Sequence, residues 1–320
     1  MHAAVVRSFE RPPRYETMEP PRARTGDEVV VDVLAAGLHP RVRSEASGSH
    51  YTSSGALPLV PGIDGVARLP DGRRVYFVVH DTAMGTMAEK TVLDRRRCDE
   101  LPDGVDEAEV AAAMNPAMSS WIALRKRIAF APGQRVLVLG ATGNAGQMAI
   151  QIAKRLGAGL VIGAGRNRER LAALAALGAD AAVPLDGDPE AAMGALGEAA
   201  AEVDVVLDYL WGEPAERAMP ALLTARSDRA RPLSWIQIGS IAGPTIALPS
   251  ATLRAANLNL MGSGQGSVAV REIVAELPAL IAEIAAGALA IHALRVPLAE
   301  VESAWTAKTA PGQRLVFVPA

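Results

Sequence analysis

A glycine-rich turn between an apolar run and an amphipathic stretch is the segment of this chain best suited to hold a phosphate. Val136–Leu139 contains no polar residue, and apolar residues recur at helical spacing after the turn until Gly157 supplies a helix stop. The first turn of a helix exposes backbone N–H groups and the positive end of its dipole, which suits a pyrophosphate. A strand, a glycine turn and a helix in this order predict a dinucleotide site at Ala141, Thr142, Gly143, Asn144, Ala145 and Gly146. The alternative is an ordinary strand–loop–helix unit whose glycines serve packing alone.

A second apolar run, Leu160–Gly165, predicts the next buried strand. It ends about twenty residues beyond the glycine turn, where an acidic residue would bind the ribose hydroxyls of NAD. This chain instead has Gly165, Arg166, Asn167 and Arg168 at that place. Guanidinium groups bind a 2′-phosphate through paired, charge-assisted hydrogen bonds, so the sequence favours NADP(H) over NAD(H). The alternative is that Arg166 and Arg168 only solvate the start of a helix over Glu169–Leu177.

Composition excludes several other functions. The formal net charge of -3 and an aromatic content of 4% argue against a nucleic acid or an anionic membrane as the partner. The single cysteine, Cys98, can form neither an internal disulfide nor a multi-cysteine zinc site. Met1–Arg7 lacks the apolar core of a signal peptide, and no apolar stretch reaches membrane-spanning length, so we expect a cytoplasmic protein.

The elements around the glycine turn predict how it is positioned. Strands and helices alternate from residue 133 to residue 264, which is typical of a parallel, doubly wound α/β sheet with its ligand at the carboxyl ends of the strands. The first third of the chain is rich in short strands, with a long irregular region between Gly37 and Gly65. A helix over Val270–Ala286, kinked or split at Pro278, and a strand over Arg314–Val318 close the chain.

This order predicts a nucleotide domain inserted into a β-rich one. We place the first part of the β-rich domain at residues 1–120, the nucleotide domain at 121–266 and the second part of the β-rich domain at 267–320. A substrate is then expected in the cleft between the two lobes.

The chain resembles the medium-chain dehydrogenase/reductase superfamily, in its zinc-free quinone oxidoreductase (zeta-crystallin-like) branch. Ala141, Gly143 and Gly146 match the glycine motif of that family, and several further stretches match in order and spacing: Leu57–Gly65, Gly85–Glu89, Leu101–Gly104, Met118–Leu124, Val203–Asp208 and Pro311–Arg314. The resemblance implies a Rossmann domain inserted into a GroES-like catalytic domain. It also implies NADPH-dependent reduction of a small quinone or an electron-poor alkene such as an enone. We expect a homodimer, with a tetramer left open, because the predicted edge strand Leu258–Gly262 offers a pairing surface.

Zinc-dependent members of the superfamily place a cysteine after an Ala-Ala-Gly-Leu segment and a Gly-His-Glu further on. Here His39 stands at the first place, and the second contains Ile63 and Asp64. Ile63 cannot bind a metal, and the four-cysteine lobe is missing. The comparison with these relatives therefore predicts that no zinc is bound.

The resemblance also implies a reaction site. Without a Lewis acid, hydrogen-bond donors must stabilise the charge that builds on the acceptor oxygen. Tyr51 is the candidate donor or proton relay, and its alternative role is a cover over the cleft. His39, in the place of a family asparagine, is either a second donor or a structural histidine. Ser119 matches a hydroxyl that meets the cofactor, and the strand ends expected beside the nicotinamide are Ile238, Gly239, Ser240, Met261, Gly262 and Ser263.

Two other functions fit parts of this pattern. An enoyl-thioester reductase would need a basic entry for a long acyl carrier, which Arg41 and Arg43 suggest only faintly. A non-catalytic NADPH-binding protein would bind the cofactor without consuming it with any acceptor.

Overall fold

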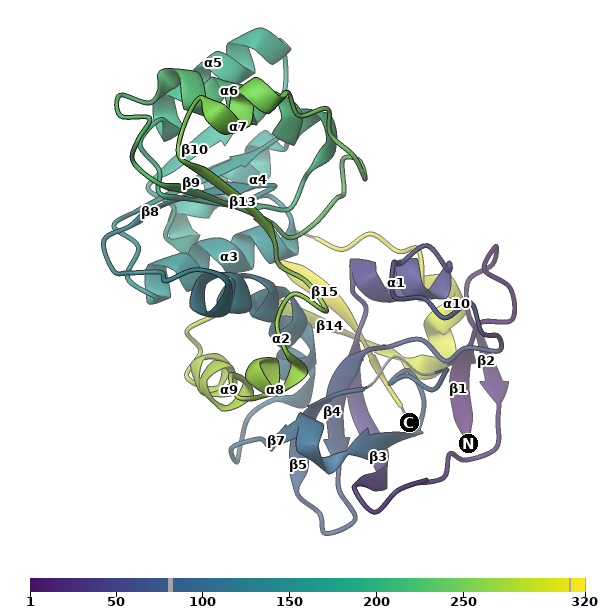
Figure 1. The fold of residues 1–320 in the computed structure, drawn as a ribbon. Helices are drawn as coiled ribbons and strands as arrows, with labels where there is room; N and C mark the ends of the chain where they lie inside the picture. Colours follow the sequence, from purple (N-terminus) through teal and green to yellow (C-terminus); the bar gives the residue numbers. More distant parts are fainter. Residues whose placement is uncertain (80–82, 311, 320) are drawn as a thin grey trace. The chain divides into compact units, whose positions relative to one another are not determined.

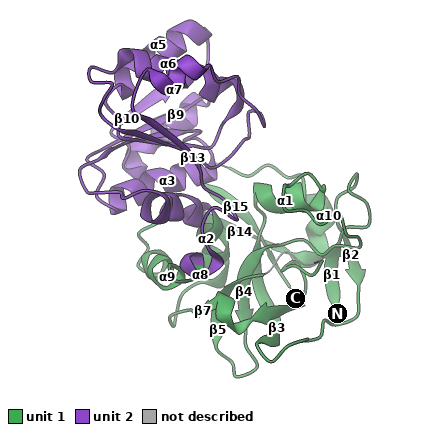
Figure 2. Ribbon diagram, viewed as in Figure 1, with its two compact units in different colours: residues 1–115, 274–320 green, residues 116–273 purple. Residues whose placement is uncertain are grey.

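The computed structural model describes residues 1–79, 83–310 and 312–319. Pro311, which begins one of the stretches that resemble the family, lies outside this part of the chain. The chain divides into two compact units, coloured separately in Figure 2. Unit 1 comprises residues 1–115 and 274–320, and unit 2 comprises residues 116–273.

Unit 2 is built on a six-stranded parallel sheet, and it holds all of the predicted cofactor residues. The strands lie in the order β10-β9-β8-β11-β12-β13, which is the doubly wound order of a dinucleotide-binding fold. Their bounds are β8 (Arg135–Leu139), β9 (Leu160–Gly165), β10 (Ala181–Pro184), β11 (Val205–Asp208), β12 (Leu233–Gln237) and β13 (Leu258–Gly262). The α/β class predicted from the alternating pattern is therefore confirmed. After β10 the chain crosses to β11, on the other side of β8, so the switch point of the sheet lies between the neighbouring strands β8 and β11. Ligands of this fold bind beside such a switch point.

Helices cover both faces of this sheet (Figure 1). Leu137 and Leu139 of β8 pack with Leu196 and Leu222 on the face covered by α5 and α6, while α3 covers the other face. The helices of unit 2 are α3 (Asn144–Arg155), α4 (Arg168–Ala172), α5 (Pro189–Ala200), α6 (Gly212–Ala225), α7 (Ser250–Arg254) and α8 (Val270–Val274). Burial on both faces explains why β8 is apolar from Val136 to Leu139, after the exposed Arg135.

Unit 1 is a β-rich body. A seven-stranded sheet runs in the order β14-β15-β3-β4-β5-β7, with β6 paired to β3, and β1 and β2 form a separate antiparallel pair. The strands are β1 (His2–Val5), β2 (Arg14–Thr17), β3 (Glu28–Gly37), β4 (Asp64–Arg68), β5 (Arg74–Val78), β6 (Lys90–Asp94), β7 (Cys98–Glu100), β14 (His292–Pro297) and β15 (Gln313–Val318). Its helices are α1 (Pro40–Ala46), α9 (Leu277–Ala285) and α10 (Val301–Ala304), and α2 (Glu107–Ile122) runs from unit 1 into unit 2.

Two local predictions have different outcomes. The region between Gly37 and Gly65 was expected to be irregular, but it contains α1, which begins at Pro40. Proline suits the first turn of a helix because its ring fixes φ and its missing N–H would be unpaired there. The predicted division at Pro278 is confirmed, since α8 ends at Val274 and Pro278 lies in the first turn of α9.

No helix in the described part of the chain is both long and apolar enough to cross a membrane.

Candidate functional site

The glycine-rich turn joins the carboxyl end of β8 to the start of α3. Gly140 has a φ of 86°, a conformation that favours glycine, and its carbonyl accepts a hydrogen bond of 3.1 Å from Gly143 N. A Cβ at Gly146 would lie 2.3 Å from the Gly140 carbonyl oxygen, so only glycine lets α3 begin this close to the turn. Gly143 is the N-cap and offers no side chain to the N–H groups of the first helical turn. These features fit a pyrophosphate, which would accept from those groups.

The end of β9 lies against this turn. A Cβ at Gly165 would lie 2.7 Å from Thr142 Cγ2, so the two predicted segments are in contact. Asn167 caps α4, because its side-chain oxygen accepts from Arg170 N at 2.9 Å. The guanidinium of Arg170, which the sequence analysis did not single out, donates to the Thr142 carbonyl oxygen at 3.2 Å. The structure thus ties the segment after β9 to the glycine-rich turn through backbone and side chain.

Arg166 and Arg168 have different surroundings. Arg168 Nε donates to Asp186 Oδ2 at 2.7 Å, and this carboxylate raises the pKa of Arg168. Arg166 is exposed, and its side chain makes no hydrogen bond or ion pair with any residue that the structure describes. Of these two guanidinium groups, that of Arg166 is therefore the one available to a phosphate.

Ser119 lies in α2 and meets a tyrosine that the sequence analysis did not include. Its Oγ donates to the Pro116 carbonyl oxygen at 2.7 Å and lies 2.9 Å from Tyr209 Oη. Because the Ser119 proton is used, the Tyr209 hydroxyl donates to Ser119 Oγ. Burial raises the pKa of Tyr209 to about 12, so this hydroxyl keeps its proton at neutral pH. Tyr209 directly follows β11, one strand end from the glycine turn.

A buried carboxylate shapes the turn after β11. Asp208 is fully buried; its Oδ1 accepts from Leu210 N at 2.8 Å and Trp211 N at 2.9 Å, and its Oδ2 accepts from Trp235 Nε1 at 3.0 Å. Trp211 has a φ of 52°, which is strained for a residue with a side chain. The Asp208 side chain thus holds the turn in a conformation that the backbone alone would not favour.

The later strand ends that were predicted to border the nicotinamide lie next to this turn. The Asp208 carbonyl oxygen accepts from Ile238 N at 2.7 Å and from Gly239 N at 3.1 Å. Ser263 N donates to the Gln237 carbonyl oxygen at 2.8 Å, which joins the end of β13 to the end of β12. All of these segments lie at the carboxyl edge of one parallel sheet, together with Ser240, Met261 and Gly262.

In unit 1, His39 belongs to a buried set of charged and polar side chains, which we call the His39 network: His39, Asp64, Tyr76 and Arg314. His39 Nε2 lies 3.0 Å from Asp64 Oδ1, and Tyr76 Oη donates to Asp64 Oδ2 at 2.7 Å. Arg314 Nη1 lies 2.9 Å from His39 Nδ1 and donates to the Leu38 carbonyl oxygen at 3.2 Å. Every member is at most 5% exposed. The sequence analysis placed Asp64 next to Ile63, at the segment where zinc-dependent relatives have Gly-His-Glu. It did not predict that Arg314 reaches His39.

The contacts of His39 fix its protonation. Arg314 can only donate, so His39 Nδ1 accepts, and the ring proton sits on Nε2 and is donated to Asp64. Burial is the main reason that the pKa of His39 lies below its ordinary value, and Asp64 acts in the opposite direction. The imidazole is therefore neutral, with both nitrogens engaged inside unit 1.

Tyr51 lies on a loop that follows α1. The loop is tied back to the helix, because His50 N donates to the Ser44 carbonyl oxygen at 3.1 Å and Arg41 Nη2 donates to Thr52 Oγ1 at 3.4 Å. The Tyr51 ring is 71% exposed, and its centroid lies 4.4 Å from that of His50. In this position within unit 1 the phenol can meet a ligand from solvent.

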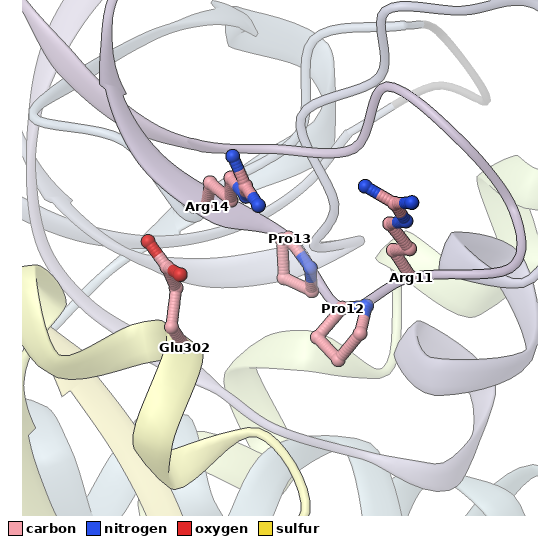
Figure 3. Close-up of a pocket in the computed structure, with 5 residues that line it drawn as sticks. All are labelled: Arg11, Pro12, Pro13, Arg14 and Glu302. Carbon is pink, nitrogen blue, oxygen red and sulfur yellow. The ribbon is translucent and has the colours of Figure 1, made fainter.

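A separate hollow in unit 1 is lined by Arg11, Pro12, Pro13, Arg14 and Glu302 (Figure 3). None of the predicted site residues lines it. It therefore gives no support to the expected reaction site.

Comparisons with known proteins agree with this geometry. A family model described as zinc-binding dehydrogenase matches residues 145–285. The probable NADPH-dependent quinone reductase tdiC of Emericella nidulans is 30% identical over 360 aligned positions that cover 100% of both chains. The chloroplastic NADPH-dependent alkenal/one oxidoreductase of Arabidopsis thaliana is 30% identical over 173 residues, 49% of this chain and 45% of that protein. The quinone oxidoreductase of Thermus thermophilus, a structure also determined with NADPH, has a TM-score of 0.77 at 27% identity and covers 99% of this chain and 100% of that one.

Proposed function

Because this chain belongs to the zinc-free quinone oxidoreductase branch of the medium-chain dehydrogenase/reductase superfamily, we infer its reaction from that membership. It is an enzyme that transfers a hydride from NADPH to a quinone or to an electron-poor alkene such as an enone. The observation that carries this function is the close approach of α3 to the end of β8, which only glycine at position 146 permits. When bound, NADPH supplies the hydride.

We propose that Arg166 selects NADPH over NADH. Its exposed guanidinium stands directly after β9, and no described residue neutralises it. Arg168 is held by Asp186, while Arg170 braces the glycine turn through Thr142. A 2′-phosphate at this place would give Arg166 the anionic partner that the protein does not provide.

We propose that the hydroxyl pair of Ser119 and Tyr209 orients the cofactor near its nicotinamide end. The Tyr209 proton is used by Ser119 Oγ, so the pair is a fixed polar contact and not a source of protons. The turn held by Asp208 and the neighbouring Ile238–Ser240 segment supply the wall of this part of the site.

Negative charge builds on the conjugated oxygen of the acceptor as the hydride arrives, and we propose Tyr51 as its hydrogen-bond donor and proton relay. Of the two roles considered for His39, a second donor to the acceptor or a structural histidine, we propose the structural one. Both of its ring nitrogens are engaged in the His39 network. The same contacts support a reaction without zinc. A histidine that accepts from an arginine is not a metal ligand, and the second family position holds Ile63.

Two further proposals rest on the sequence and on sheet topology. We propose a cytoplasmic homodimer in which the edge strand β13 pairs with its copy in a second chain. β13 is the last strand of the sheet, so one of its edges is without a neighbouring strand in the described chain. Light scattering of the purified protein, with a proline placed in β13 as the disrupting variant, tests this pairing.

The reaction is tested by following the absorbance of reduced nicotinamide with p-benzoquinone or a simple enone as the acceptor. We expect consumption of NADPH with either acceptor and much slower consumption of NADH. NADPH that raises the melting temperature but is never oxidised would identify a binding protein and refute the proposed reaction.

A further inference from the structure

Arg43 is a half-buried cation with no carboxylate partner among the residues that the structure describes. It lies one helical turn beyond His39, because Arg43 N donates to the His39 carbonyl oxygen at 3.1 Å at the start of α1. Loss of water lowers the pKa of its guanidinium. A charge that is partly removed from water and left unpaired costs free energy, so a partner from outside the chain would stabilise this arrangement.

Arg314 adds a second observation at the same place. It is 5% exposed and uses Nη1 for its contacts with His39 and Leu38, but its Nε is buried with no hydrogen-bond partner. The positive charge of Arg43 is near enough to oppose that of Arg314. Asp64 offsets the charge of Arg314, whereas the charge of Arg43 has no such partner among the described residues.

The described contacts leave one positive charge near the start of α1 without a carboxylate. Asp64 acts on Arg314, His39 is neutral, and Arg43 has no carboxylate partner among the described residues. An anion with a single negative charge would balance Arg43. Arg314 is too deeply buried for a ligand to reach, so contact would fall to Arg43.

We propose that Arg43 is a specificity-determining residue that selects electron-poor alkenes or quinones bearing a carboxylate. A single guanidinium matches a carboxylate through two parallel hydrogen bonds, whereas a phosphate would require further cations within reach. This inference rests on the proposed function, because the carboxylate belongs to the acceptor of that reaction. Tyr51 and Arg43 stand on the same α1–loop segment, which would let one residue serve the oxygen and the other the carboxylate.

The test compares two acceptors that differ only in charge, β-acetylacrylate and its methyl ester, with NADPH at saturation. We expect wild-type kcat/KM to be higher for the carboxylate. Arg43→Gln should lower kcat/KM for the carboxylate by about 10- to 100-fold, mainly through KM, and leave the ester within about twofold. For Arg43→Lys we expect a kcat/KM for the carboxylate between those of the wild type and Arg43→Gln, because lysine keeps the charge and loses the paired hydrogen bonds. The matched control, Arg22→Gln, removes the same charge from an exposed position and should leave kcat/KM unchanged for both acceptors.

A readout without turnover uses the reduced product. Levulinate should raise the melting temperature of the NADP⁺-loaded wild-type protein more than methyl levulinate does, and Arg43→Gln should abolish the difference. If Arg43→Gln lowers kcat/KM equally for the acid and the ester, the role of Arg43 is overturned. Equal stabilisation of the wild-type protein by levulinate and methyl levulinate would overturn it as well. If wild-type enzyme reduces p-benzoquinone but does not distinguish the two acceptors, this inference fails and the proposed function stands. If none of the acceptors supports oxidation of NADPH, the proposed function and this inference both fail.

Discussion

The glycine-rich turn of unit 2 and the His39 network of unit 1 are built in opposite ways. In unit 2 the turn is shaped by backbone contacts between residues near one another in the sequence, such as Gly140 and Gly143. In unit 1 the His39 network includes a contact between side chains far apart in the sequence: His39 and Arg314 are separated by 275 positions. The first site depends on space that glycine leaves open, and the second depends on charges that are buried together. The two should therefore fail in different ways.

The largest effect should follow from removing one charge of the His39 network. Arg314→Met leaves Asp64 buried without its cation, which should lower the free energy of unfolding by about 3–5 kcal/mol. Urea unfolding measures this change. The control, Arg22→Met, removes an exposed arginine and should shift the free energy of unfolding by less than about 0.5 kcal/mol. Similar values for both variants would contradict a role for the network in stability.

Filling the space in the turn should mainly damage cofactor binding. Gly146→Val places a Cβ 2.3 Å from a backbone oxygen that cannot move away by a rotamer change. We expect NADPH to bind at least about 100-fold more weakly, as measured by calorimetry. Gly194→Ala in α5 is the matched control, since no heavy atom lies within 4 Å of its added Cβ. Unchanged NADPH affinity in Gly146→Val would break the comparison.

Arg166 sharpens the comparison, because it is a side-chain contact added to a backbone site. Arg166→Ala should weaken NADPH binding by about 10- to 100-fold and leave NADH binding within about twofold. Arg168→Ala should have a smaller effect on NADPH, since that guanidinium is engaged by Asp186. Equal losses for the two coenzymes would reject the phosphate assignment.

Tyr51 tests whether unit 1 contributes chemistry in addition to its buried network. Tyr51→Phe removes the hydroxyl of a residue that is 71% exposed and keeps its ring. We expect kcat to fall about tenfold while NADPH affinity stays the same. An unchanged kcat would reject Tyr51 as a donor or proton relay and leave it a residue that only covers the site.

The smallest effect concerns pH and should be confined to unit 1. Burial places the pKa of His39 below its ordinary value, so the unfolded chain binds this proton more readily than the folded one. Stability from the neutral histidine is complete above about pH 6.5 and is lost as the pH falls toward the lowered value, by at most about 1.4 kcal/mol per pH unit. Asp64, Arg314 and Arg41 face the ring and share in this balance. The slope of unfolding free energy against pH should flatten in His39→Asn; an identical slope would exclude His39 as its source.

Much of the fold could be predicted because its signals are local. The apolar strands β8 and β9, the glycine turn and the break at Pro278 each depend on a few neighbouring residues. Among the elements that escaped prediction, two did so for identifiable reasons. β10 includes the exposed residues Ala181 and Ala182 and pairs only with β9, so it lacks the apolar pattern of a buried strand. α1 begins at Pro40, and a proline is itself a helix-start signal in the sequence, but it lies in a region rich in turn residues.

The sequence by itself determined the glycine-rich turn, because backbone geometry there follows from the order of glycines and apolar residues. It also placed Arg166 and Arg168 together after β9. Only the tertiary structure decided that Asp186 engages Arg168 while Arg166 stays available, and that Arg314 meets His39. Such pairings depend on which strands become neighbours in the sheet, and charges distant in the sequence meet only when long-range strand pairing brings them together.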